Sequence, residues 1–298
     1  MSDPGLRKAY IELHLAVFLF GFTGILGKLI QVDAIVLVWH RIWLTAIFMF
    51  LLVLVTRRWQ KIPLKKLPEI ALISTLIVTH WVLFYASIKL AGVSVAMICL
   101  SSITFFTAIF EPLVFKTRFV PLHFLFATVV IFGIYLMAND QQEQTAGIIV
   151  GIISAMFSSL FTVFNKRILP AYRPRMLSFV EMSLGFVMLT LMLPLFNLFF
   201  PMDFRLPSDE DWLYLILLSF FCTVVAFNLS LNALNKLSAF TVNLAINLEP
   251  VYAIILAFVF FKEYEMLGTG FYIGTTLILL SVIGDALIRR KARKPKLP

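Results

Sequence analysis

Apolar and polar positions alternate along this chain in long blocks. Ten apolar stretches are separated by short polar connections. The hydrocarbon core of a bilayer takes about 20 residues of apolar helix, so the pattern predicts ten transmembrane helices, near residues 12–30, 34–56, 67–88, 93–115, 120–138, 146–165, 176–200, 212–232, 238–261 and 267–288. The connections are too short to hold a soluble domain. We therefore expect an all-α integral membrane protein.

A polar segment without basic residues, 139–145, lies near the middle of the chain. We expect it to be an external linker between two five-helix repeats, residues 1–138 and 146–288, with a basic cytoplasmic tail at 289–298. An odd number of helices per repeat would make the two repeats inverted. Weak internal similarity agrees with this division, because 21–30 aligns with 159–168, with Lys28 opposite Lys166, and 84–96 aligns with 227–240. Inverted repeats are typical of secondary transporters.

Composition and charge narrow the class further. Hydrophobic residues make up 61% of the chain and charged residues 14%, a balance that excludes a water-soluble enzyme. With the N-terminus inside, 20 of the 25 Lys and Arg residues fall in cytoplasmic segments. This asymmetry predicts a cell-membrane protein with both termini in the cytoplasm. It also accounts for the net charge of +9 without a nucleic-acid partner. We expect the first apolar stretch to be retained, not cleaved as a signal peptide.

Ionisable side chains inside a span are costly, so they mark candidate functional positions. His40 and Arg41 lie at a similar depth in the second span as Glu181 in the seventh. Arg41 and Glu181 could together bind a zwitterion or close a gate. The alternatives are a structural pair near the membrane edge, or an Arg41 side chain that extends to the interface.

Two Glu-Pro pairs suggest sites for coupling or gating. Glu111-Pro112 continues a polar stripe with Thr104 and Thr107, which could hold a proton or cation. Alternatively, Glu111 could pair with Lys116 or with an arginine of a loop.

The second pair, Glu249-Pro250, lies in the middle of its span, after Asn243 and Asn247 on a shared helix face. Broken helices at this depth are where transporters bind substrate. A carboxyl group there would suit proton coupling. The alternative role for the two asparagines is hydrogen bonding between helices.

His80, Trp81 and Tyr85 place an imidazole and two amphipathic rings on neighbouring helix faces. They could form the wall of a pocket, although Trp and Tyr also form interfacial belts. The four histidines show no metal-ligand spacing, and Cys99 and Cys222 both lie inside predicted spans. We therefore expect neither a metal nor a cofactor.

The ninth predicted span carries the most specific motif. It begins with Ser238 and small residues, has Glu249-Pro250 at its midpoint, and ends with Phe261-Lys262-Glu263. In this motif, and in its ten apolar stretches, the chain resembles the drug/metabolite transporter superfamily, in its EamA-like ten-helix branch. The first half departs from the motif, because Glu111 lies farther from Ser94 than Glu249 lies from Ser238.

The resemblance implies a secondary transporter that exports amino acids or related small metabolites by alternating access, with protons as candidate coupling ions. The expected partners are a small-molecule substrate and the lipid bilayer, and a homodimer is a candidate assembly. The alternatives are an uncoupled, channel-like facilitator, a receptor or assembly subunit, and an intramembrane enzyme, for which the sequence offers no nucleophile motif. The candidate substrate-binding residues are His40, Arg41, His80, Trp81, Tyr85, Glu181, Asn243 and Asn247. The candidate coupling or gating residues are Glu111, Pro112, Glu249 and Pro250.

Overall fold

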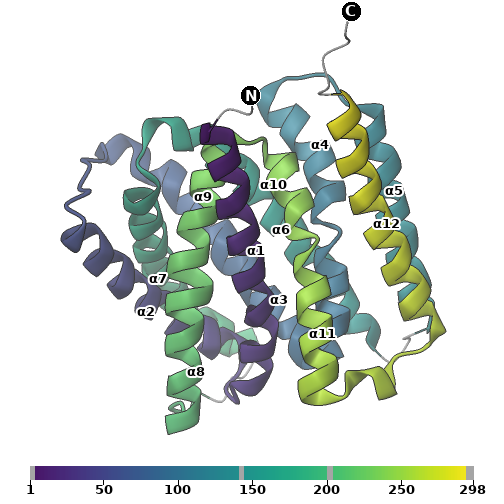
Figure 1. Cartoon of the computed structure of the whole chain (residues 1–298). Coiled ribbons are helices and arrows are strands. Elements are labelled where there is room, and N and C mark those ends of the chain that lie inside the picture. Colours follow the sequence, from purple (N-terminus) through teal and green to yellow (C-terminus); the bar gives the residue numbers. More distant parts are fainter. Residues whose placement is uncertain (1–3, 141–143, 200–203, 293–298) are drawn as a thin grey trace, which may run out of the picture.

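The structure is a bundle of helices (Figure 1). It is a computed structural model that describes residues 4–140, 144–199 and 204–292. In the first half, the helices are α1 (Pro4–Leu29), α2 (Ala34–Val55), α3 (Leu67–Leu100), α4 (Ile103–Phe115) and α5 (Pro121–Asp140), with a short 3-10 turn at Leu64–Lys66.

The second half repeats this arrangement of long and broken helices. It contains α6 (Thr145–Ile168), α7 (Pro174–Phe199), α8 (Asp209–Ser219), α9 (Ala226–Lys236), α10 (Ala239–Ile246), α11 (Glu249–Phe261) and α12 (Thr269–Ala292). Short 3-10 turns occupy Leu169–Ala171 and Glu263–Met266, and a π-helical segment, Phe220–Val225, joins α8 to α9.

Seven helical segments in the described part of the chain are long and apolar enough to cross a membrane. They are Pro4–Leu29, Ala34–Val55, Leu64–Leu100, Thr145–Ala171, Pro174–Leu198, Asp209–Lys236 and Ala239–Phe261. Three shorter apolar segments are Ile103–Phe115, Phe124–Met137 and Thr269–Ser281. Each of the ten predicted spans therefore coincides with apolar helix, and in the described part of the chain seven helical segments are both long and apolar enough to cross a membrane.

The predicted third and fourth spans are joined in one long helix, α3. Where the sequence predicts a connection between the two spans, the structure has a local break within α3 at Gly92, which has a φ of +84°. Only glycine adopts this conformation without strain. The fourth predicted span is then divided again between Leu100 and Ile103, where α3 ends and α4 begins. It thus consists of a short helical segment, Val93–Leu100, followed by α4.

A comparable break divides the ninth predicted span. The helix α10 ends at Ile246, and α11 starts at Glu249 with Pro250 in its first turn. Proline is well placed there because the first residues of a helix have no intrahelical partner for a backbone N–H. Each half therefore contains one helix that is interrupted inside the bundle.

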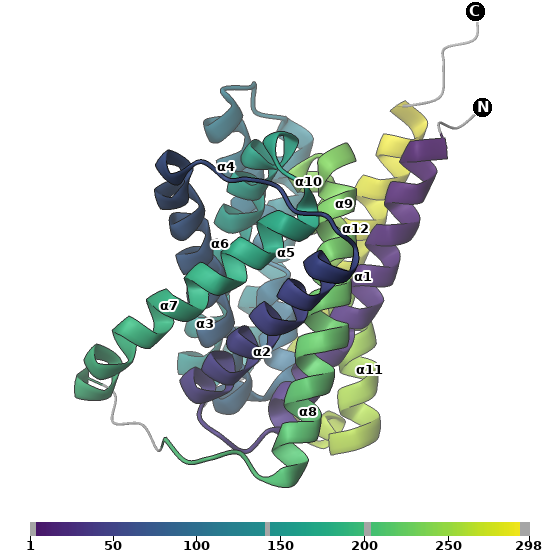
Figure 2. The same ribbon diagram turned by 90° about the vertical axis from the view of Figure 1, so that its left-hand side faces the viewer.

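The helices pack in pairs from opposite halves of the chain. The closest associations include α3 with α6, α1 with α9, and α2 with α7. A separate pair, α5 and α12, packs mainly on itself at one side of the bundle (Figure 1), where Gly133 and Gly274 bring the two backbones close together. The start of α1 and the end of α12 lie at the same end of the bundle (Figures 1 and 2).

Candidate functional site

A cavity lies between the two halves, in the middle of the bundle. Its polar lining comes from residues of both halves: Thr23, Arg41, His80, Ser158, Thr223 and Glu249. Its aromatic lining consists of Phe20, Trp81, Phe84, Phe161 and Phe227. A cavity with apolar walls and a few convergent polar groups is the usual form of a small-molecule site.

Arg41 supplies the positive charge of this cavity. Arg41 is only 3% exposed, so the guanidinium group is almost completely removed from the protein surface. Nη1 donates a hydrogen bond of 2.7 Å to Tyr85 Oη, and Nε donates one of 3.0 Å to Thr223 Oγ1. The guanidinium carbon lies 3.9 Å from the centre of the Trp81 ring. A cation above an aromatic face is attracted by the ring's quadrupole.

The partner Thr223 belongs to the π-helical segment Phe220–Val225. Its hydroxyl donates to the carbonyl of Leu218, five residues earlier, and accepts from Arg41. Single π-helical turns within α-helices often lie at functional sites because they redirect side chains. This turn brings both Thr223 and Cys222 to the cavity.

Glu249 supplies the acidic group of the cavity. It is 5% exposed, and Thr23 Oγ1 of α1 lies 3.3 Å from its Oε1. Glu249 and Arg41 are close enough to interact electrostatically. Arg41 and Glu249 form no direct ion pair in the described part of the chain. The cavity thus holds one basic and one acidic group, each from a different half of the chain.

His80 fixes one wall of the cavity. Its Nδ1 lies 2.9 Å from the Ser154 hydroxyl, which donates a hydrogen bond of 2.8 Å to the carbonyl oxygen of His80. The imidazole also packs against Phe84 and Phe161. Of the predicted substrate-binding residues, Arg41, His80 and Trp81 line the cavity together with Glu249, and Tyr85 contacts it through Arg41.

Two predicted residues lie elsewhere. His40 packs between Trp39 and Trp212, and its Nδ1 lies 2.9 Å from the carbonyl oxygen of Val36. Glu181 is 1% exposed, and neither of its carboxylate oxygens has a hydrogen-bond partner among the described residues. The contacts of Arg41 do not include Glu181, so the structure does not bring the expected Arg41–Glu181 pair together.

Asn243 and Asn247 connect α10 to α4. Asn243 donates a hydrogen bond of 2.8 Å to Thr107, and Asn247 donates one of 2.6 Å to Thr104. Their amide nitrogens thus make the interhelical bonds named above as the alternative to substrate contact. These bonds lie beside the break that separates α10 from α11.

Glu111 reaches across to the other half of the chain. Its Oε1 accepts from the N–H of Ala239 over 2.9 Å, and its Oε2 accepts from the N–H of Phe240 over 2.8 Å. The neighbouring Pro112 lies within α4, far from the break that precedes Ile103. Pro250, in contrast, directly follows a break.

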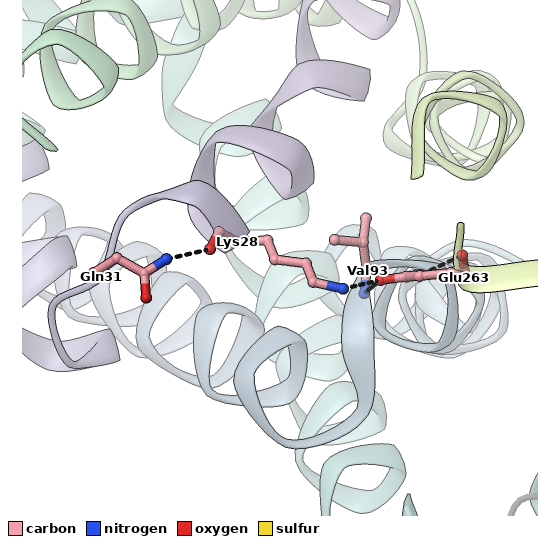
Figure 3. A network of polar contacts seen from close by, with 5 residues as sticks. Lys28, Gln31, Val93 and Glu263 are labelled. Carbon is pink, nitrogen blue, oxygen red and sulfur yellow. Dashed lines mark hydrogen bonds and ion pairs between the residues drawn. The ribbon is translucent and has the colours of Figure 1, made fainter. Parts of the chain in front are cut away.

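The sequence analysis did not identify a second carboxylate of this kind. Glu263 accepts from Lys28 Nζ over 2.6 Å, from the N–H groups of Val93 and Ser94 over 3.0 and 2.8 Å, and from Ser94 Oγ over 2.6 Å. Figure 3 shows Lys28 extending from α1 toward Glu263 beside the backbone of Val93. Burial by itself would raise the pKa of Glu263, but these hydrogen bonds together hold it below its ordinary value of 4.5.

Comparison with known protein families identifies the family of this chain. The model of the EamA-like transporter family matches residues 7–139 and again residues 145–284. The chain belongs to the EamA-like transporter family. Two matches in succession mean that the chain contains two copies of the family's unit. The family is one of transporters, and the long apolar helices of this chain are those of a multi-pass membrane protein.

Other comparisons support the fold and the general role. The chain is 28% identical over 156 residues to a protein of Archaeoglobus fulgidus described as an uncharacterized transporter, a match that covers 52% of this chain and 50% of that protein. The chain thus spans about half the length of this relative. One crystal structure aligns with a TM-score of 0.70 over 97% of this chain and 99% of its own, at 15% identity, which shows a shared fold.

Proposed function

We propose that this EamA-like transporter is a secondary transporter that exports amino acids or closely related zwitterionic metabolites. The observation that carries the proposal is that a basic side chain, Arg41, and an acidic one, Glu249, share one aromatic-lined cavity without a direct ion pair. A buried charge is costly unless it is paired. A zwitterion would pair with both side chains at once, with its carboxylate at Arg41 and its ammonium group at Glu249.

The remaining lining suits a substrate with an apolar or aromatic side chain. Phe84, Phe161 and Phe227 offer apolar surface, and the ring of Trp81 is already occupied by Arg41 on one face. His80 is held by Ser154 and can offer a single polar contact at this wall. Apolar walls supply affinity and the few polar groups supply orientation.

Glu249 is also the proposed coupling site. Its carboxyl group can take up a proton when the substrate's ammonium group leaves, and release it when a new substrate binds. Substrate and proton would then compete for the same oxygens, which couples the outward movement of one to the inward movement of the other. Thr23 Oγ1 lies 3.3 Å from Glu249 Oε1, and its single hydroxyl proton has a closer acceptor in the carbonyl oxygen of Phe20, at 2.6 Å. The hydroxyl can therefore donate to the carboxylate or, bonded to Phe20, accept from the protonated acid.

The proposed topology has ten spans in two inverted repeats, with both termini in the cytoplasm of a cell membrane. Support comes from the successive family matches, from the pairing of breaks in α3–α4 and α10–α11, and from the basic residues expected on one face. On this topology, the cavity would open to each side in turn.

Transport by the purified protein in proteoliposomes tests the substrate class. We expect saturable efflux of radiolabelled amino acids with large apolar side chains. Unlabelled compounds should compete only if they carry both charges, so the corresponding amine, amide and des-amino acid should compete at least tenfold more weakly.

The matched variants are Arg41→Gln in the cavity and Arg58→Gln at an exposed position beyond the end of α2. The first should abolish saturable efflux, and the second should leave it unchanged. Efflux no faster than from empty liposomes for every amino acid would contradict the proposed substrate class. Equal competition by the singly charged analogues would contradict the roles of Arg41 and Glu249.

A further inference from the structure

Two carboxylates bind the starts of short helical segments in the opposite half of the chain. Glu263, which follows α11, accepts from the N–H groups of Val93 and Ser94, at the start of the segment Val93–Leu100. Glu111, in α4, accepts from the N–H groups of Ala239 and Phe240, at the start of α10. The first N–H groups of a helix have no intrahelical partner, and the helix dipole favours a negative charge there.

A lysine accompanies each carboxylate. Lys28, in the last turn of α1, donates to Glu263 over 2.6 Å. Lys166, in the last turn of α6, interacts electrostatically with Glu111 and donates to the carbonyl of Leu234 over 2.7 Å. The two lysines are the ones that the internal similarity of the sequence aligns.

The two contacts lie at opposite ends of the bundle. The segments α10 and α11 follow one another across the bundle, with Ala239 at the start of the first and Glu263 directly beyond the second (Figure 1). The breaks in the two interrupted helices lie between these contacts, and Leu100, Ile246 and Glu249, which flank the breaks, line the central cavity. Each short segment therefore runs from one carboxylate contact to the cavity.

We infer that the Glu263 contact and the Glu111 contact are the two gates of the central cavity, and that transport opens one while the other stays closed. This inference rests on the proposed alternating access. Each contact ties the two halves of the chain together at one end only. Breaking one contact frees a short segment, Val93–Leu100 or α10, to move at that end, while the other contact holds the opposite end shut.

A native cysteine reports on the gates directly. Cys222 lines the cavity, whereas Cys99 is fully buried against Gly151. In a Cys99→Ala background, Cys222 is therefore the single thiol. The experiment measures how fast a membrane-impermeant anionic methanethiosulfonate reacts with Cys222 when applied from either side of vesicles of defined orientation. No substrate is needed, so the result is independent of the proposed amino-acid cargo.

Glu263→Gln should raise the labelling rate of Cys222 by roughly tenfold or more from the Glu263 end, with no change from the other end. Glu111→Gln should do the reverse. Ser94→Ala removes one donor to Glu263 without altering a charge, and should give a smaller rise at the same end. Glu69→Gln, which breaks the surface pair with Lys66 at the start of α3, is the matched control and should change neither rate.

Equal rises from both ends in either Glu variant would mean general loosening and would overturn the assignment. Unchanged rates in both variants would overturn it as well. If labelling is one-sided as expected but no amino acid is transported, the gates stand and the proposed substrate is wrong. If amino acids are transported but the labelling rates do not depend on the side, the proposed substrate class stands and the assignment of the two gates is wrong.

Discussion

At the scale of single residues, the cavity depends on how Arg41 is held. A buried guanidinium needs acceptors for its N–H groups, and Tyr85 and Thr223 supply two of them. Tyr85 in turn packs against the backbone of α1 at Gly27, where an added Cβ would collide with the tyrosine ring. The absence of a side chain at Gly27 is therefore a requirement of the charged site, although Gly27 itself does not line the cavity.

Gly27→Ala should displace Tyr85 and weaken its bond to Arg41. We expect a loss of about 1–3 kcal/mol in the free energy of unfolding, because a buried donor loses its partner, and at least a fivefold loss of substrate affinity by equilibrium binding. Gly24→Ala, one turn earlier, is the comparison, since its Cβ would press on Met97 Cε and Val93 Cγ1 without meeting Tyr85. It should lower stability and leave the contact between Tyr85 and Arg41 in place. Equal effects of the two substitutions would contradict this role of Gly27.

The residue scale also shows where sequence reasoning ends. Arg41, His80, Trp81 and Glu249 could be selected because polar groups inside apolar spans are costly. Thr223 and Cys222 could not, since their place at the cavity depends on a π-helical turn that leaves no clear mark in the sequence. Glu181 was selected by the same rule as Arg41, but it is not among the residues that line the cavity, and the rotation of α7 that decides this is not visible in the sequence.

At the scale of elements, interrupted helices create the functional geometry. The ten apolar stretches were predictable from length and hydropathy, and each coincides with helix. The continuation of α3 through Gly92 was not predictable. A single glycine with positive φ changes the direction of a helix there without a polar connection that the sequence would show. Glu263 was recognised as the end of a motif, but its hydrogen bonds to Val93 and Ser94 join residues too distant in sequence to be inferred.

The contact between Glu263 and the segment Val93–Leu100 should depend on pH in a defined direction. A carboxylate whose pKa is lowered by folding stabilises the folded state above its ordinary value of 4.5, and this stabilisation is lost as the pH falls through the lowered value. Thermal unfolding in detergent should therefore show a decline of stability below pH 4.5 that is smaller in Glu263→Gln. A variant with the same acid dependence as the wild type would contradict the hydrogen-bonded carboxylate.

At the scale of the whole molecule, the two halves share one cavity and are tied together at both ends. Arg41 comes from the first half and Glu249 from the second, so neither half holds the complete charge pair. The pair α5 and α12 stands apart from this centre (Figure 1), and its outward faces include exposed Phe132, Tyr135 and Ile273. Lipid or a second copy of the chain would cover such a surface in a membrane.

The most direct test of the account is proton-coupled efflux through Glu249. Proteoliposomes loaded with a labelled apolar amino acid would be compared with and without an inward proton gradient, for the wild type, Glu249→Gln and the surface control Glu69→Gln. We predict that the gradient accelerates efflux by the wild type and the control, and that Glu249→Gln transports at a rate that no longer responds to pH. An undiminished response in Glu249→Gln would show that coupling resides elsewhere, and equal, pH-insensitive efflux in all three would identify an uncoupled facilitator.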